Sequence, residues 1–356
     1  MPTSLSSKPR ILTGDTPTGR LHLGHYVGSI ERRLALQESH DCFFILANVH
    51  AYTTRYKLSA DIRRDTIDIV RDYLAAGIDP AKSTIFLQSE IPAIAELTFF
   101  FAMLIGYGRL MKNPTIKDEI RVKDLGDSYS FGFLCYAVGQ TADILAFRPE
   151  AVPVGEDQVP HIEMTREVAR HFNQIYCGVS DQTPDEDHVK AGGVFPVPRA
   201  DVGRVGRLVG TDGKNKMSKS LNNAILLSDT AKEVEKKFNR IFTGRQSPTE
   251  PGDPTNVLFQ YHDAFNRNAA RVAEMKSLYA EGRIGDGDVK KELSAAINSL
   301  LEPMRARRAM YEGRDDLILD VLREGCRRAN AATEETLALA KEKMNVRYFD
   351  RELRYR

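Results

Sequence analysis

The chain has 356 residues, of which 42% are hydrophobic and 28% charged, with a formal net charge of +1. This length accommodates two or three structural units, and the composition is ordinary for a soluble globular protein. The balanced charge excludes binding to nucleic acid by bulk attraction, so a nucleic-acid partner would have to be held by local basic patches.

The four cysteines lie far apart and form no CxxC pair, which favours reduced thiols over a disulfide framework or a zinc site. Residues 1–9 are predicted to be a flexible tail, because the segment is Ser-rich and lacks the apolar core of a signal peptide. The longest apolar stretch, Leu97–Ile105, is too short to span a bilayer. We therefore expect a cytoplasmic protein with no membrane anchor and no metal site of its own.

Short apolar runs alternate with helical patterns in the first part of the chain. Strands are predicted at 10–14, 42–49, 83–88 and 151–155, and helical spacing begins at Gly24 and covers Asp61–Ala76. The run from Cys42 to Val49 is apolar throughout, as expected of a strand buried on both faces. Strand–helix alternation predicts an α/β fold with a parallel sheet and right-handed crossovers.

Two further helical patterns, Ile94–Ile105 and Phe131–Phe147, predict a helical insertion at about 93–150, with a loop at 112–130 between them. A helix is predicted at 161–172, and the segment 178–207 is expected to be mostly loop because it is rich in Pro, Gly and Asp. From Ser228 onward, Lys- and Glu-rich helical patterns dominate. The sequence thus predicts one domain at 10–227 and an all-helical domain at 228–356.

A glycine-punctuated turn follows the first predicted strand and runs from Thr13 to His25. A turn between a buried strand and a helix presents backbone N–H groups to an anion. Gly24 would let a ligand approach the backbone closely. His22 and His25 are three residues apart, so both can point the same way and donate hydrogen bonds to phosphate oxygens during phosphoryl or nucleotidyl transfer. Two histidines that merely cap a helix are the plainer alternative.

A second motif is the basic loop of residues 214–220, which follows a Gly-containing turn and has no hydrophobic periodicity. Ammonium groups on a flexible polar loop can close over a triphosphate and neutralise the departing pyrophosphate. A short basic run considered alone is more often a solvated loop, so this motif gains its weight from the first one.

The strings His22-Leu-Gly-His25 and Lys216-Met-Ser-Lys-Ser220 together resemble the two signature motifs of class I aminoacyl-tRNA synthetases. The longer strings 16–26, 152–158 and 161–166 are similar to the bacterial tryptophanyl-tRNA synthetases. The resemblance covers about residues 10–345. It implies a Rossmann-type catalytic domain, a helical anticodon-binding domain and a homodimer. It also implies a two-step reaction with ATP, L-tryptophan and tRNA(Trp), in which Mg²⁺ accompanies ATP and is not held by a dedicated protein site.

The resemblance assigns catalytic roles to His22, His25, Lys216 and Lys219. It assigns ATP contacts to residues of three segments: Thr16, Pro17, Thr18, Gly24, His25, Gly155, Glu156, Asp157, Leu208, Lys216, Met217, Ser218, Lys219 and Ser220. Asp157 follows a buried strand, where open α/β sheets bind ligands, and suits the ribose hydroxyls. Leu208 matches a position whose backbone contacts the adenine. Lys117, in the predicted loop 112–130, is a candidate for contact with pyrophosphate, with a solvated lysine as the alternative.

Tyr136, Gln140 and Asp143 lie at i, i+4 and i+7 of an otherwise apolar predicted helix. A buried polar stripe is costly unless it is satisfied, so it marks either an amino-acid pocket or three core groups bonded to one another. In the family, the carboxylate matching Asp143 accepts the indole N–H of tryptophan, and Gln158 suits the α-amino end. The same carboxylate could accept a phenolic O–H, and many bacterial tryptophanyl enzymes carry methionine where this chain has Gln140. Tyrosine therefore stays open as the alternative substrate.

Six arginines in the helical C-terminal part fit, as a group, a weak and salt-sensitive contact with the tRNA backbone. They are Arg305, Arg307, Arg308, Arg323, Arg327 and Arg328. Acidic residues are interspersed among them, so the plainer alternative for each one alone is a solvated helix charge. Two other functions stay open: a nucleotidyltransferase that acts on a small metabolite, and a paralogue that kept the fold for a binding or regulatory role. The first would lack the helical C-terminal part and the separate basic loop, and the second would commonly have lost one of the two motifs.

Overall fold

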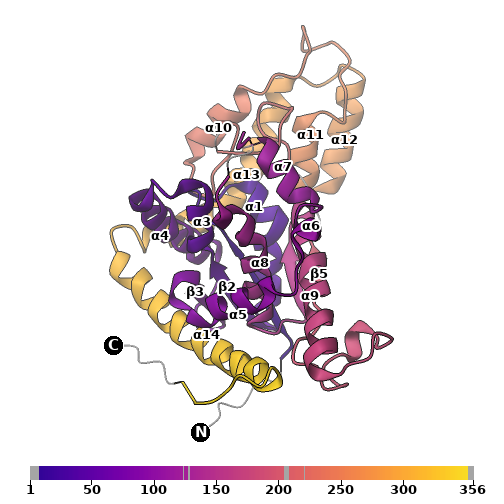
Figure 1. Ribbon diagram of the computed structural model, residues 1–356. Helices are drawn as coiled ribbons and strands as arrows, with labels where there is room; N and C mark the ends of the chain where they lie inside the picture. Colours follow the sequence, from indigo (N-terminus) through magenta and orange to yellow (C-terminus); the bar gives the residue numbers. More distant parts are fainter. Residues whose placement is uncertain (1–7, 123, 127–128, 204–207, 220, 352–356) are drawn as a thin grey trace.

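A computed structural model of the chain describes residues 8–122, 124–126, 129–203, 208–219 and 221–351. Five parallel strands form one sheet in the order β3-β2-β1-β4-β5 (Figure 1). The strands are β1 (Arg10–Asp15), β2 (Asp41–Leu46), β3 (Ser83–Leu87), β4 (Ala151–Val154) and β5 (Arg199–Val202). The predicted α/β fold with a parallel sheet is confirmed. The second strand ends at Leu46, earlier than predicted, because helix α3 begins at Asn48.

Side chains alternate between the two faces of the sheet and build two hydrophobic cores. Ile11 and Phe44 belong to one core, whereas Leu12 and Phe43 belong to the other. All of these side chains are buried, which explains why the strands read as continuous apolar runs in the sequence.

Helices cover both faces (Figure 1). The N-terminal helices are α1 (Leu23–His25), α2 (Glu31–Leu36), α3 (Asn48–Arg55) and α4 (Ser59–Ala76). The insertion and the segment after it contain α5 (Pro92–Ala102), α6 (Tyr107–Leu110), α7 (Pro114–Val122), α8 (Phe131–Leu145) and α9 (Val159–Cys177). The C-terminal helices are α10 (Ala231–Asn239), α11 (Val257–Phe265), α12 (Ala269–Ala280), α13 (Asp286–Ala309) and α14 (Asp315–Lys343).

Two segments that were predicted to be loops contain regular structure. The prediction of a loop at 112–130 is wrong for Pro114–Val122, which forms α7 with proline at its start. Asn113 caps this helix by accepting the Thr115 N–H at 3.0 Å, and Ile116 is fully buried. The segment 178–207 contains β5, which pairs with β4 from Arg199 to Val202. Residues 204–207 lie outside the described part of the chain.

The C-terminal helices occupy two different places. Helices α10 and α11 pack on α13, which in turn packs on α4, and Figure 1 shows them at the top of the molecule. Helix α14 instead runs along the edge strand β3 and contacts α5. Gly325 makes this approach possible, since a Cβ there would lie 1.7 Å from the carbonyl oxygen of Ile85. The boundary predicted at 228 stays a prediction, and the helices beyond it do not form one cluster.

Within the described residues, no helix combines the length and the apolar character that a membrane crossing requires.

Candidate active site

The two turns singled out in the sequence follow neighbouring strands. Strands β1 and β4 lie side by side, with β2 and β3 on one side and β5 on the other. Parallel sheets bind ligands at such a reversal of strand order, beyond the carboxyl ends of the strands. Thr16 follows β1 and Gly155 follows β4, so both turns open at this position.

The two histidines of the first motif are held in one tautomeric form by the backbone. The Gly24 N–H donates to His22 Nδ1 at 3.1 Å, and the His22 N–H donates to His25 Nδ1 at 3.1 Å. Because each Nδ1 accepts a hydrogen bond, the ring proton of each histidine is assigned to Nε2. The two rings lie 3.8 Å apart, so the site presents two neighbouring N–H donors.

Both histidines are uncharged at neutral pH. Burial, together with the neighbouring His25, lowers the pKa of His22 to about 2. Burial also lowers the pKa of His25 to about 4, although Asp15 acts in the opposite direction. Gly24 is needed beside them, since a Cβ there would lie 2.9 Å from two atoms of the His22 ring. The histidines can therefore act as neutral hydrogen-bond donors and not as cations.

A buried ionic cluster that no pattern in the sequence predicts supports the end of β1. The Arg33 guanidinium donates to Asp15 at 2.9 Å and to the Tyr73 hydroxyl at 2.7 Å. Burial raises the pKa of Asp15, but Arg33 and His25 outweigh this effect and lower it to about 2. A salt bridge between charges eighteen residues apart leaves no local pattern, which is why only the structure reveals it.

The basic loop is an ordered hairpin in its described part. The Met217 N–H donates to the Leu208 carbonyl at 2.9 Å, and both side chains are buried. The Asn223 side chain is almost fully buried and accepts the Ser218 N–H at 2.7 Å. Gly210 provides the space for Asn223, because a Cβ would come within 2.3 Å of its amide. Ser220 lies outside the described residues.

The lysines of this loop reach the other two segments. Lys219 Nζ lies 3.0 Å from the Arg20 carbonyl and 3.5 Å from the Thr18 hydroxyl. Lys216 Nζ lies 3.3 Å from Asp157. The segment after the hairpin is also tied to the first motif, since the Leu23 N–H donates to the Ile225 carbonyl at 2.9 Å. The structure thus brings together the three segments that the sequence predicted to act together.

A chain of polar contacts leads from this junction to α8. Gln158 donates to Asp157 and accepts from Gln140, both at 3.2 Å. Burial raises the pKa of Asp157, but Lys216 and the Gln158 amide outweigh it, so the net shift is downward. The α7 helix joins the same turn, since the Thr115 hydroxyl donates to the Asp157 carbonyl at 3.0 Å. Among the other predicted residues, Thr16, Thr18 and Glu156 are exposed, and Pro17 is buried.

The polar stripe on α8 consists of residues that each bond to a different segment. Tyr136 contacts His161 at 3.3 Å, Gln140 contacts Gln158, and Asp143 contacts Gln88. The alternative of three core groups bonded to one another is therefore wrong. The partners of the stripe come from the turns that follow β3 and β4 and from α9.

Asp143 is buried and accepts both of its bonds from one amide. Gln88 Nε2 lies 2.8 and 2.9 Å from the two carboxylate oxygens, and 3.0 Å from His50 Nε2. The Gln88 oxygen accepts the Val49 and His50 N–H groups, which fixes the orientation of the amide. Burial raises the pKa of Asp143 to about 8, with Gln88 acting against it. Gln88 and His50 were not predicted, because nothing in their local sequence points to α8.

The structure also gives the positions of Lys117 and of the C-terminal arginines. Lys117 lies on α7 with an exposed side chain, and its contact with pyrophosphate stays a prediction. The contact of the arginine group with tRNA stays a prediction; within the group, Arg307 and Arg308 bond to α4 of the protein itself. Arg323 and Arg327 are exposed, and each pairs with an acidic residue of its own helix.

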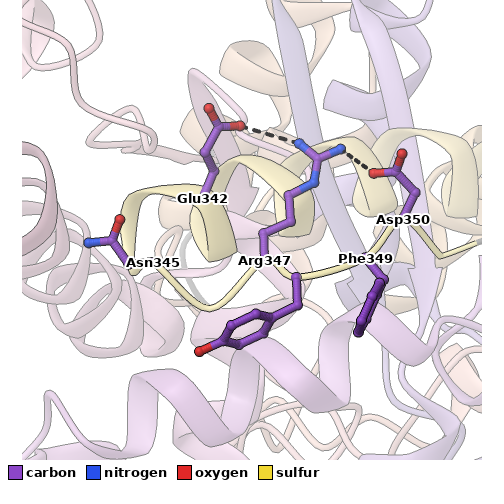
Figure 2. A pocket seen from close by; sticks show the side chains of 6 residues that line it. Glu342, Asn345, Arg347, Phe349 and Asp350 are labelled. Carbon is purple, nitrogen blue, oxygen red and sulfur yellow. Dashed lines mark hydrogen bonds and ion pairs between the residues drawn. The ribbon is translucent and has the colours of Figure 1, made fainter.

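A surface pocket lies apart from these residues, where α14 ends (Figure 2). It is lined by Glu342, Asn345, Arg347, Tyr348, Phe349 and Asp350. Arg347 bridges Glu342 at 3.3 Å and Asp350 at 2.7 Å, so its charge is balanced within the lining. None of the predicted site residues is part of it.

Known proteins that are similar to this chain support the interpretation of its two sequence motifs. The family described as "tRNA synthetases class I (W and Y)" matches residues 4–302. The tryptophan–tRNA ligase of Treponema pallidum is 45% identical over 342 residues, which cover 95% of this chain and 97% of the relative. The tryptophan–tRNA ligase of Streptococcus mutans is 43% identical over 350 residues, 96% of this chain and 100% of the relative.

Among solved structures, the tryptophanyl-tRNA synthetase of Campylobacter jejuni in complex with ADP and tryptophan has a TM-score of 0.79 and 30% identity. The match covers 94% of this chain and 99% of the other. The family model and the relatives both extend over most of the chain, and the fold and the convergence of the motifs agree with them. The chain therefore belongs to the class I tRNA synthetases, in the family of the tryptophanyl and tyrosyl enzymes.

Proposed function

We propose that this chain is a tryptophan–tRNA ligase that activates L-tryptophan with ATP and transfers it to the 3′ end of tRNA(Trp). The observation that carries the proposal is the convergence of Lys219, the histidine pair and Asp157 at the reversal of strand order. The full-length relatives, which are tryptophan–tRNA ligases, support the amino acid.

The activation step would proceed by attack of the tryptophan carboxylate oxygen on the α-phosphorus of ATP. A carboxylate–phosphorus bond forms, the bond from the α-phosphorus to the bridging oxygen breaks, and pyrophosphate leaves. His22 and His25 would donate hydrogen bonds from their Nε2–H groups to phosphate oxygens, while Lys216 and Lys219 would neutralise the pyrophosphate. Mg²⁺ is expected to arrive with ATP as part of the substrate. In the second step, a terminal ribose hydroxyl of the tRNA attacks the acyl carbon and AMP leaves.

The roles of the histidines follow from their protonation. A neutral imidazole ring donates one hydrogen bond and carries no net charge. It can therefore bind a phosphate oxygen of ATP without forming an ion pair that would retain pyrophosphate. The lysines supply charge from a separate loop, which can withdraw after the reaction. The lowered pKa values of both histidines agree with this division, in which the histidines donate hydrogen bonds and the lysines supply positive charge.

For the amino acid, we propose that Asp143 accepts the indole N–H. Its carboxylate is positioned by Gln88, and His50 lies 3.6 Å away. The pocket would end at Gln140 and Gln158, with Gln158 close to the α-amino group. Tyrosine stays the alternative, because a phenol could also donate to Asp143.

The decisive experiment is amino-acid-dependent exchange of pyrophosphate into ATP, with tryptophan and tyrosine measured in parallel. Exchange with tryptophan is expected, exchange with tyrosine alone would overturn the amino-acid assignment, and exchange with neither would refute the synthetase function. Asp143→Ala should weaken transition-state binding of tryptophan by about 2–4 kcal/mol, the scale of losing a buried charged acceptor. A near-wild-type kcat/KM would exclude Asp143 as the indole acceptor.

A homodimer in the cytoplasm is part of the proposal. Three large side chains at the end of α5 and the start of α6 support it, since Phe99, Met103 and Tyr107 are each at least 63% exposed. Phe99 and Met103 are one helical turn apart and can share a face. Light scattering during gel filtration should give a dimer mass for the wild type and a smaller mass for Phe99→Ser. A monomeric wild type would refute this part.

A further inference from the structure

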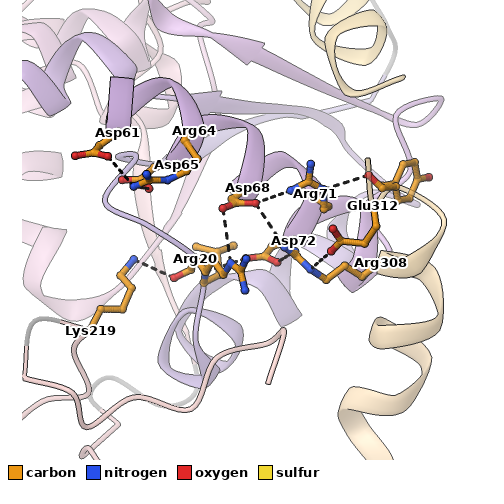
Figure 3. A network of polar contacts seen from close by, with 12 residues as sticks. Arg20, Asp61, Arg64, Asp65, Asp68, Arg71, Asp72, Lys219, Arg308 and Glu312 are labelled. Carbon is orange, nitrogen blue, oxygen red and sulfur yellow. Dashed lines mark hydrogen bonds and ion pairs between the residues drawn. The ribbon is translucent and has the colours of Figure 1, made fainter. Parts of the chain in front are cut away.

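A row of acidic residues on α4 lies next to the turn that follows β1 (Figure 3). Asp72 is the most deeply buried of them, with 1% of its surface exposed. One of its carboxylate oxygens accepts the Leu21 N–H at 2.9 Å. The other pairs with the Arg308 guanidinium, which comes from α13 near the other end of the chain. A single buried carboxylate thus joins the turn after β1 to a C-terminal helix.

The peptide unit that Asp72 holds is also the one that Lys219 contacts. Leu21 supplies its N–H to Asp72, and Arg20 supplies the carbonyl of the same peptide to Lys219 at 3.0 Å. The groups form one line: the lysine ammonium, the peptide dipole, the Asp72 carboxylate and the Arg308 guanidinium. Charges at both ends polarise the peptide in the same direction, so each bond strengthens its neighbours.

Arg308 is the partner that allows the buried Asp72 carboxylate to remain ionised. Burial raises the pKa of Asp72 to about 6, and Arg308 is the largest influence that lowers it. Arg308 also lies 3.6 Å from Asp68 and 3.2 Å from Glu312. Without Arg308, Asp72 would be an unpaired buried charge, which a protein relieves by protonation or by local opening.

The peptide between Arg20 and Leu21 directly precedes His22. A shift of this peptide would move the start of α1 and with it the backbone N–H groups that fix both histidine rings. It would also displace the carbonyl on which Lys219 rests. Misplacement on this scale affects a reaction whose catalysis depends on orientation.

We propose that Asp72 and Arg308 are positioning residues for amino-acid activation, which fix the Arg20–Leu21 peptide and thereby the histidine pair and Lys219. The inference rests on the proposed function for its catalytic consequence, but not for the geometry. It assigns to a residue of α13, far from both sequence motifs along the chain, control over the placement of the reacting groups.

The test compares Arg308→Gln with Arg307→Gln. Arg307 is the adjacent residue of α13 and also contacts α4, but through the carbonyls of Ala75 and Ala76 at 2.6 and 3.2 Å. Arg308→Gln should lower kcat of tryptophan-dependent pyrophosphate exchange about tenfold or more, with the KM for tryptophan unchanged. Arg307→Gln should keep the wild-type kcat. Equal losses in both variants would mean that only the packing of α13 matters, and would overturn the proposal.

Hydrogen–deuterium exchange of the segment 18–24 provides a readout that needs no substrate. Exchange in this segment should accelerate about tenfold in Arg308→Gln and remain at the wild-type rate in Arg307→Gln. A folded Arg308→Gln with unchanged protection would refute the positioning role. Because this measurement is independent of catalysis, it stands even if the wild type failed to activate tryptophan, a result that would refute the proposed function alone.

Asp72→Asn serves if Arg308→Gln does not fold. It keeps an oxygen for the Leu21 N–H but removes the negative charge, so both effects should appear in the same direction. A double-mutant cycle of Asp72→Asn with Lys219→Ala should show non-additive losses in kcat. Additive losses would show that the peptide does not link these residues.

Discussion

Binding of tryptophan should release a proton from Asp143. Burial raises the pKa of this carboxyl group to about 8, so most of the free protein carries a proton on it at pH 7. An indole N–H donates to the ionised carboxylate, and binding therefore lowers the pKa of Asp143. Affinity for tryptophan should therefore rise with pH and level off above a pH of about 9.

The magnitude can be worked from the same value. With a pKa about one unit above pH 7, ionising Asp143 costs ~1.4 kcal/mol, so Kd at pH 7 should be about tenfold higher than at pH 9. About 0.9 proton should leave per tryptophan bound at pH 7, if the pKa in the complex falls well below 7. The nearby His50 and His161 do not contribute in this range, because burial lowers the pKa of each to about 4.

Isothermal titration calorimetry in buffers of different ionisation enthalpy measures this release. Asp143→Asn is the matched control, since it keeps an acceptor of the same shape that cannot titrate. It should bind tryptophan without proton release and with a Kd independent of pH from 6 to 9. Identical binding enthalpies in phosphate and Tris for the wild type would refute the reasoning, because Asp143 would then be ionised before tryptophan binds or would not contact it.

Three other outcomes follow from the site. Lys219→Ala should lower the activation rate constant about 100-fold in single-turnover assays with little change in tryptophan affinity, and an unchanged rate would remove this lysine from the mechanism. Gly24→Ala should lower kcat while the melting temperature changes little, because a Cβ would lie 2.9 Å from the His22 ring; wild-type kcat would show that the ring position is irrelevant. His161 is buried and its pKa is lowered to about 4, so it should cost stability as pH falls from 6.5 to 4, by ~3 kcal/mol in total. The free energy of unfolding, measured with urea at pH 7 and pH 5, should change less with pH in His161→Gln than in the wild type. An equal change in both proteins would contradict this.

The sequence predicted the elements whose signals are local. The turn after β1 and the basic loop could be predicted because their glycines, histidines and lysines occur at fixed spacing within a short stretch of sequence. The sheet was predicted from apolar runs, since strands buried on both faces have no polar positions. Helix α7 could also have been found: Asn113 before Pro114 is an N-cap signal, and Ile116 and Ile120 lie one turn apart.

Other features have no local signal. Gln88 gains its meaning only through Asp143, 55 residues away, and Arg308 only through Asp72, 236 residues away. The edge strand β5 was not predicted because none of its four residues is fully buried and it follows a proline-rich segment. Burial and partner choice are properties of the folded chain, so the charged residues that complete the site had to be read from the structure.

The packing of α14 on β3 has a consequence for how the protein is made. An uncovered edge strand offers unpaired backbone groups to other chains. Here the Leu87 N–H meets the Cys326 sulfur at 3.4 Å, and the residue that covers the edge lies 239 positions further along. During synthesis the sheet can form long before α14 leaves the ribosome, so the nascent chain carries an open β edge for most of its translation. Shortening the chain before Asp315 should therefore expose this edge and yield aggregation.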